Sequence, residues 1–225
     1  MGQAENMDKA GHKEMAWHLG KAGDMGKAMC KGQAEQMYKP TRKDRADVYH
    51  LIFRGYQGRH LFRLDQEKLK FLYLLNACLE RTGSVLFAFV LMNTHVHLLV
   101  QSKKLQLLKK LVICSYTGWF SWLHQTKGLL FERDVSAFCK TRTDWQVDTL
   151  LYILNNPVEA GICQSPGNYR YSSYYFYTDK RIKLRQVIRV DPSLALENFE
   201  SHGHFKEMLS TKMAYQAKMK SIKYK

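Results

Sequence analysis

The stretch that decides the fold is residues 84–101, which read SVLFAFVLMNTHVHLLVQ. An apolar run breaks at Asn93-Thr94 and resumes at once with His95 and His97. Both halves are rich in Val, Leu and Phe and are short enough for strands, so the sequence predicts two strands with a tight connection. Residues two apart on a strand share a face, so His95 and His97 point the same way. Such a pair can bind a divalent metal with a third ligand from elsewhere, or can be two exposed polar residues with nothing bound.

The segments on either side predict the other elements. Residues 48–53 have strand composition, and residues 65–82 read as a helix with Asp65 as N-cap and Gly83 as its stop. A second long helix is expected over 105–125, followed by an irregular stretch over 128–143.

A third helix is expected over residues 145–155. It should end near Asn156, because the residue before Pro157 is disfavoured in the helical region. Residues 191–216 are expected to add one or two short helices. This order predicts an α+β fold, a ferredoxin-like antiparallel sheet with helices on one face, plus a C-terminal helical basic extension.

Composition and charge bound the function. The 225 residues carry a formal net charge of +15, which suggests a polyanionic partner, most often nucleic acid; a generically basic soluble protein is the alternative. The five cysteines are scattered and form no C-x-x-C pair, which fits a reducing cytosol. No apolar run is long enough to span a bilayer, and no signal-peptide region is seen.

A second chemical pattern lies in the third predicted helix. Tyr152 and Asn156 are one turn apart on the same helix face, where a phenol and an amide oxygen could serve as nucleophile and metal ligand. A phenol is mostly neutral at pH 7, so a divalent ion that stabilises developing charge would assist it. The alternative is a half-buried aromatic and a helix-end amide. Tyr116 is a rival nucleophile, but its apolar neighbours favour a place in the core.

Four stretches occur in an order that resembles a known family. They are YHLIFRG over 49–55, MNTHVHLL over 92–99, YILNNPVEAG over 152–161 and YSSY over 171–174. Together they resemble the single-tyrosine transposases of the His-hydrophobe-His (HUH) nuclease superfamily, in particular the REP-associated tyrosine transposase group. The resemblance covers about residues 47–178, which we take as the HUH-type domain, between an N-terminal extension over 1–46 and a basic C-terminal extension over 179–225.

The resemblance implies a chemistry and a substrate. His95, His97 and Asn156 would bind Mg²⁺ or Mn²⁺, and Tyr152 would attack single-stranded DNA, leaving a 5′-phosphotyrosine and a free 3′-OH. A second 3′-OH would complete strand transfer in DNA transposition. The partner would be single-stranded or hairpin DNA in the bacterial cytosol, near the nucleoid. Relatives include monomers and dimers that share the tyrosine helix, and the sequence does not decide between them.

Three tryptophans are candidates for stacking on unpaired bases, namely Trp119, Trp122 and Trp145. Core packing is the expectation for at least two of them.

Two departures from the family pattern are visible. Asn93-Thr94 replaces the usual Pro-Asn before the first histidine, and Glu132 and Asp134 replace a Gln and an Arg in the loop after the second long helix. These changes leave open a non-catalytic, domesticated DNA- or RNA-binding protein on the same fold. An unrelated metallohydrolase would keep the histidines without needing Tyr152.

Overall fold

A computed structural model describes residues 47–178 and 182–223, and the predicted extension over 1–46 lies outside the described residues. The sheet has four antiparallel strands in the order β2-β3-β1-β4. Their bounds are β1 Val48–Arg54, β2 Val85–Leu91, β3 His95–Gln101 and β4 Ser136–Lys140. Helix α3 (Asp65–Thr82) joins β1 to β2, and α4 (Leu105–His124) joins β3 to β4. This is the strand order and helix placement of the predicted ferredoxin-like fold.

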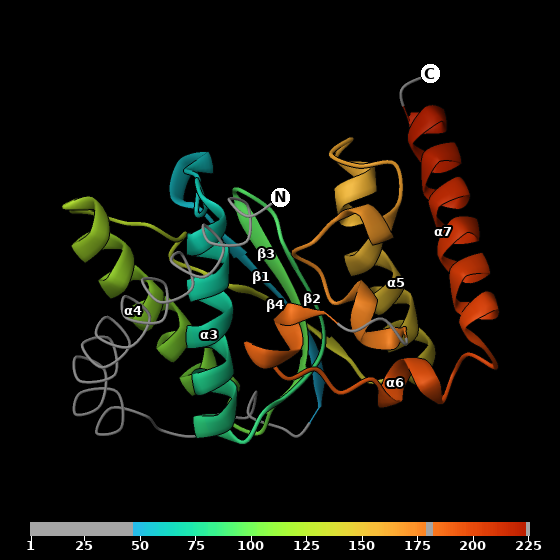
Figure 1. Ribbon diagram of the computed structural model, residues 1–225, viewed down its shortest axis with the longest axis horizontal. Coiled ribbons are helices and arrows are strands. Elements are labelled where there is room, and N and C mark those ends of the chain that lie inside the picture. The colour runs from blue at the N-terminus through green and yellow to red at the C-terminus, as the bar shows by residue number, and fades with distance from the viewer. Residues whose placement is uncertain (1–46, 179–181, 224–225) are drawn as a thin grey trace, which may run out of the picture.

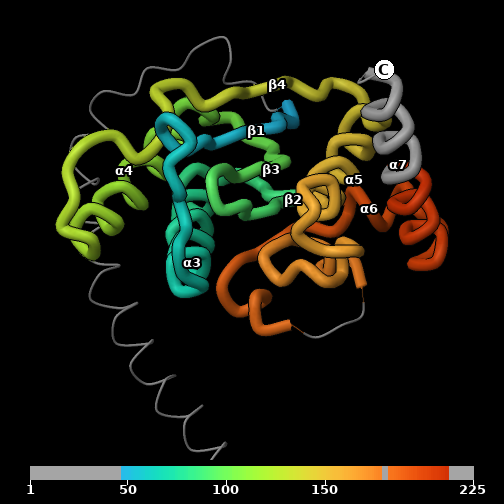
Figure 2. The backbone as a smooth tube through the Cα atoms, turned by 90° about the horizontal axis from the view of Figure 1, so that it is seen from above, coloured from blue at the N-terminus to red at the C-terminus, as the bar shows by residue number. Residues whose placement is uncertain are grey.

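The two faces of the sheet are covered by different parts of the chain (Figures 1 and 2). Alternate residues of β1 separate onto them: Tyr49, Leu51 and Phe53 belong to a core with α3 and α4. Val48 and the neighbouring strand residues on the opposite face pack against α5 (Thr143–Glu159). Helices α3 and α4 therefore cover one face of the sheet, as expected. Helix α5 covers the other face and brings its side chains over β1 and β3.

The C-terminal residues pack against α5. Helices α6 (Ser193–Leu196) and α7 (His202–Lys223) follow each other beyond α5 (Figure 1). Leu194, Phe205 and Leu209 are buried in the same apolar cluster as Leu150 and Leu154 of α5. This packing holds α5 from its outer side. Within the described residues, no helix has the length and apolarity needed to cross a bilayer.

Three local expectations were wrong, each for a physical reason. The irregular stretch contains β4, an edge strand whose middle residues are exposed, so it carries no apolar alternation. The N-cap of α3 is Leu64, because the Glu67 carboxylate accepts the Leu64 N–H at 2.9 Å. Helix α5 continues through Pro157 to Glu159, where the Ala160 N–H still reaches the Asn156 carbonyl at 3.0 Å.

Candidate active site

Three histidines meet on the face of the sheet that α5 covers. His95 and His97 lie two apart on β3 as predicted, with ring centroids 5.0 Å apart. His50 of the neighbouring strand β1 lies on the same face, and its Nε2 is 2.9 Å from Nδ1 of His97. Val96 and Leu98 point into the opposite core. The strand alternation thus places all three imidazoles under α5.

Helix α5 brings the predicted tyrosine and amide to these histidines. The Tyr152 ring centroid is 5.7 Å from that of His97 and 5.9 Å from that of His50. The Asn156 side chain lies between the two β3 histidines, with Oδ1 at 3.4 Å from His95 Nε2 and Nδ2 at 3.4 Å from His97 Nε2. The four residues singled out from the sequence therefore converge within one chain.

An open pocket of about 340 Å³ exposes these groups to solvent. Besides His95, His97, Tyr152 and Asn156, its lining includes Arg54 at the end of β1 and Glu159 at the end of α5. Arg54 donates to Ser136 Oγ of β4 at 3.1 Å, which holds the guanidinium at the pocket edge. The pocket thus brings together two imidazole rings, a phenol and an amide with one guanidinium and one carboxylate.

Burial sets the protonation of the histidines. Desolvation by burial is the main cause that lowers the pKa of His97 to about 3 and that of His50 to about 4. The neighbouring histidines add a smaller effect at His97, and Lys140 adds one at His50. The pKa of His95 is also lowered, again chiefly by burial. All three rings are therefore neutral near pH 7, and each has an unprotonated nitrogen available as an acceptor or ligand.

The phenol of Tyr152 is held neutral by the same environment. Burial and the Glu159 carboxylate raise its pKa, whereas a hydrogen bond with Asn156 and the charge of Arg54 act in the opposite direction. Ionisation of this phenol at pH 7 would therefore require further positive charge in the pocket.

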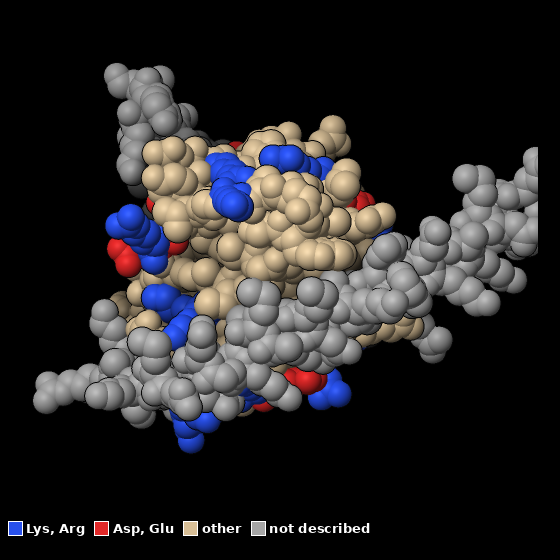
Figure 3. Space-filling model, turned by 90° about the vertical axis from the view of Figure 1, so that its left-hand side faces the viewer, with Lys and Arg blue, Asp and Glu red and all other residues tan. Residues whose placement is uncertain are grey.

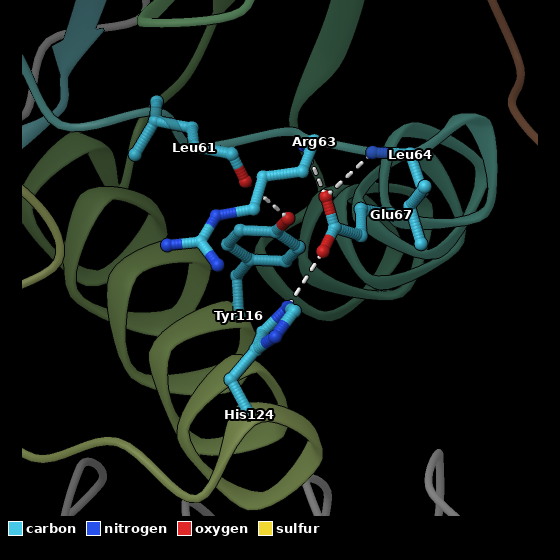
Figure 4. A network of polar contacts seen from close by, with 6 residues as sticks. All are labelled: Leu61, Arg63, Leu64, Glu67, Tyr116 and His124. Carbon is cyan, nitrogen blue, oxygen red and sulfur yellow. Dashed lines mark hydrogen bonds and ion pairs between the residues drawn. The ribbon is translucent and has the colours of Figure 1, made fainter.

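The rival Tyr116 lies on the other side of the sheet, in the polar cluster drawn in Figure 4. Its hydroxyl donates to the Leu61 carbonyl at 2.7 Å, and its ring is fully buried. Burial raises its pKa above the usual range. Beside it, the buried Glu67 carboxylate accepts from His124 Nε2 at 2.6 Å. This tyrosine is a core residue, as its apolar neighbours indicated.

The tryptophans differ from the expectation. Trp119 packs against the α3–α4 core. The side chains of Trp122 and Trp145 are 50% and 48% exposed. The prediction that at least two of the three tryptophans pack in the core was therefore wrong. Trp122 lies near the end of α4 and Trp145 in the first turn of α5. Trp122 lies two residues after the buried Phe120, off the buried face of α4, which leaves it on the solvent side.

Thr94 and Glu132, two of the residues that depart from the expected pattern, have local structural roles. Thr94 Oγ1 is 3.1 Å from Nδ1 of His95, so the altered turn supplies a partner to the first histidine. The Glu132 carboxylate accepts the N–H of Gln57 at 2.8 Å, where Gln57 has a positive φ of 51°. Glu132 therefore stabilises a strained turn.

Sequence reasoning did not single out His50, which contacts His97, or Arg54, which lines the pocket. Both lie in the first strand, and the period-2 rule applied to 48–54 would place them on the face opposite Tyr49 and Phe53. What the sequence does not provide is the pairing of β1 with β3, which sets Ile52 opposite His97 and Arg54 opposite His95.

Comparison with known proteins supports the fold alone. No family model and no curated protein sequence matches the chain. Among solved structures, that of a REP-associated tyrosine transposase bound to a REP hairpin is similar, with a TM-score of 0.50. The match covers 65% of this chain and 85% of the other at 12% sequence identity. The shared α+β fold is therefore established, and the roles of the site residues rest on their geometry.

Proposed function

We propose that the protein is a single-stranded DNA endonuclease and strand transferase of the transposase type, acting through a 5′-phosphotyrosine. The observation that carries the proposal is the Tyr152 ring beside His97 and His50, in a solvent-open pocket that also contains Arg54. The similar fold of a REP-associated tyrosine transposase supports it. All groups needed come from one chain, so no second copy is required to bring Tyr152 to the histidines.

The chain's own residues suit attack on a phosphodiester. The Tyr152 hydroxyl oxygen would bond to phosphorus as the bond to the 3′ oxygen breaks; the phenol proton passes to solvent and the leaving oxygen gains one. Arg54, held by Ser136, would pair with a phosphate oxygen. In strand transfer another 3′-OH attacks the same phosphorus, and Tyr152 regains its proton.

The donor set fits a divalent cation. Among the described residues, no cluster of three His, Cys, Asp or Glu side chains has the arrangement of a metal site. A metal here would therefore be held by His95 Nε2, His97 Nε2 and the Asn156 amide oxygen. Asn156 Oδ1 and the unprotonated Nε2 of His95 both carry lone pairs, and their separation of 3.4 Å suits two ligands of one ion better than a hydrogen bond. Bound there, the cation would neutralise charge on the phosphate; two imidazole nitrogens favour Mn²⁺ over the oxygen-preferring Mg²⁺.

His50 and Thr94 would orient the ligands. For His97 to present an unprotonated Nε2, its proton must lie on Nδ1, where His50 Nε2 accepts it at 2.9 Å. For His95 the Thr94 hydroxyl can accept from Nδ1 in the same way. Such outer partners fix the ring orientation and tautomer of metal-binding histidines.

Single-stranded or hairpin DNA is the partner we propose, in the cytosol where the chromosome lies. The net charge of +15 and the basic groups on the α4 side of the molecule (Figure 3) favour a polyanion. The similar solved structure holds a REP hairpin.

Covalent trapping tests the proposal. The protein is mixed with end-labelled hairpin DNA from the sequence flanking its own gene and with Mn²⁺, and is then run on a denaturing gel. The expected result is a labelled protein band that is lost in Tyr152→Phe and without metal but persists in Tyr116→Phe. DNA shifted on a native gel without any covalent band would favour a non-catalytic binding protein. Cleavage that survives Tyr152→Phe would favour a metallohydrolase.

A further inference from the structure

Two large aromatic side chains on the α5 side of the sheet are about half exposed. Phe138 on β4 is 52% exposed, and Trp145 in the first turn of α5 is 48% exposed. Strand β4 is an edge of the sheet, where exposed apolar side chains favour aggregation and are usually avoided. Folding therefore gives no reason for these rings to face solvent.

Phe138 contacts a histidine beside Tyr152, and Trp145 shares a helix face with Tyr152. Phe138 pairs with His50 across the strands, and their ring centroids are 6.2 Å apart. The His50 ring is in turn 5.9 Å from that of Tyr152. On α5, Trp145 and Tyr152 are seven residues apart, which places them on one helix face with roughly 10 Å of helix rise between them. Tyr152 therefore has an exposed aromatic ring on β4 and another along its own helix.

Basic groups accompany both rings. The Arg142 guanidinium lies 5.4 Å from the centre of the Trp145 ring and is fixed by two hydrogen bonds to Asp144, at 2.9 and 2.8 Å. Lys140 follows Phe138 by two residues on the same strand face. Flat apolar rings beside cations are the combination with which proteins bind single-stranded nucleic acid, since every base can stack and the cations contact phosphates.

We propose that Phe138 and Trp145 form a stacking platform for unpaired DNA bases next to the phosphate at Tyr152. This inference rests on the proposed function and names the surface that receives the single strand. Bases stacked on these rings would hold the adjoining phosphate near the phenol. The two-residue connection between β4 and α5 keeps the rings on one rigid unit.

The test is fluorescence anisotropy with a labelled short oligothymidylate and with a matched abasic chain that has the same phosphates. Phe138→Ala and Trp145→Ala are compared with Trp122→Ala, an equally exposed tryptophan on the opposite helix layer. Each platform variant should bind oligothymidylate about 5- to 150-fold more weakly, while Trp122→Ala binds as wild type. Affinity for the abasic chain should be the same in all four proteins. Thermal unfolding monitors folding, which half-exposed positions should barely change.

Several outcomes would overturn the platform. If Phe138→Ala and Trp145→Ala bind oligothymidylate as tightly as wild type, the rings do not stack on bases. If both variants lose equal affinity for oligothymidylate and for the abasic chain, the effect comes from charge and not from stacking. A shift in sedimentation from dimer to monomer with unchanged DNA affinity would assign the β4 edge to a second copy of the chain. Covalent trapping separates the two proposals. If DNA is trapped on the protein but Phe138→Ala and Trp145→Ala bind DNA as wild type does, the platform alone is refuted. If both variants bind DNA more weakly but no DNA is trapped, the nuclease alone is refuted.

Discussion

The two faces of this sheet each hold a tyrosine among histidine and oxygen groups, but the two sets differ in the lengths of their polar contacts and in their access to solvent. On the α3–α4 face, the hydroxyl of the fully buried Tyr116 donates to the Leu61 carbonyl at 2.7 Å. Beside it, the Glu67 carboxylate accepts from His124 at 2.6 Å and from the Leu64 N–H at 2.9 Å. On the α5 face, the amide of Asn156 lies 3.4 Å from each of the two β3 histidines, and Tyr152 lines an open pocket. Residue type alone does not separate the structural Tyr116 from Tyr152, the proposed nucleophile; the access of Tyr152 to an open pocket does.

The largest difference between the faces should appear in metal binding. His97→Ala removes a proposed ligand and should weaken Mn²⁺ binding by more than the roughly 10- to 100-fold that loss of an outer partner costs. His124→Ala, the matched change on the α3–α4 face, should leave Mn²⁺ binding unchanged. Calorimetric titration with Mn²⁺ measures both, and equal affinity in His97→Ala and wild type would refute the proposed ligand set.

Stability should show the reverse pattern. Glu67→Ala removes the fully buried carboxylate that accepts from the Arg63 and Leu64 N–H groups and from His124. It should cost about 3 kcal/mol, roughly a hundredfold in the unfolding equilibrium. Asn156→Ala loses two 3.4 Å contacts and a hydrogen bond with Tyr152, all at an open pocket, and should cost about 1 kcal/mol. Urea unfolding of the two variants measures this, and a larger loss in Asn156→Ala would remove the distinction between the faces.

His50 sharpens the comparison within the α5 face. His50→Ala deprives His97 Nδ1 of its acceptor and should weaken Mn²⁺ binding about 10- to 100-fold. His50→Gln offers an amide oxygen in the same place and should restore part of the affinity. If both variants bind Mn²⁺ as wild type does, His50 has no orienting role.

The pH dependence of stability should report the buried neutral histidines. The pKa values of His97 and His50 lie at about 3 and about 4 in the folded protein, below the value of 6.5 in the unfolded chain. The unfolded state therefore binds more protons, so stability is fully present above pH 6.5 and is lost as the pH falls toward about 4 and then 3. The loss should approach tenfold in the unfolding constant per pH unit for each histidine. The double variant His50→Leu, His97→Leu should show a flatter pH dependence of urea unfolding; an unchanged slope would contradict the assignment.

The sequence was sufficient for the fold and for most of the candidate site. The alternation in 95–98 placed both histidines on one face, and the helical spacing of Tyr152 and Asn156 placed them on one side of α5. These patterns are local, so they depend only on backbone geometry.

The rest depended on pairing between distant segments. His50 contacts His97 because β1 lies between β3 and β4, a register that no local pattern specifies. Strand β4 was not predicted because an exposed edge strand lacks apolar alternation. The position of Phe138 on that strand, next to His50, was therefore not predicted either. Pro157 gave a wrong helix end because the last turn of a helix can lack one N–H donor without unwinding.

The most direct test of the central claim asks which tyrosine carries the DNA. The protein is incubated with hairpin DNA and Mn²⁺, the bound DNA is digested to a short remnant, and tryptic peptides are sequenced by tandem mass spectrometry. The account predicts a nucleotide phosphate on Tyr152 and none on Tyr116. A nucleotide on Tyr116 or on another tyrosine, or cleaved DNA with no nucleotide on any tyrosine, would contradict it.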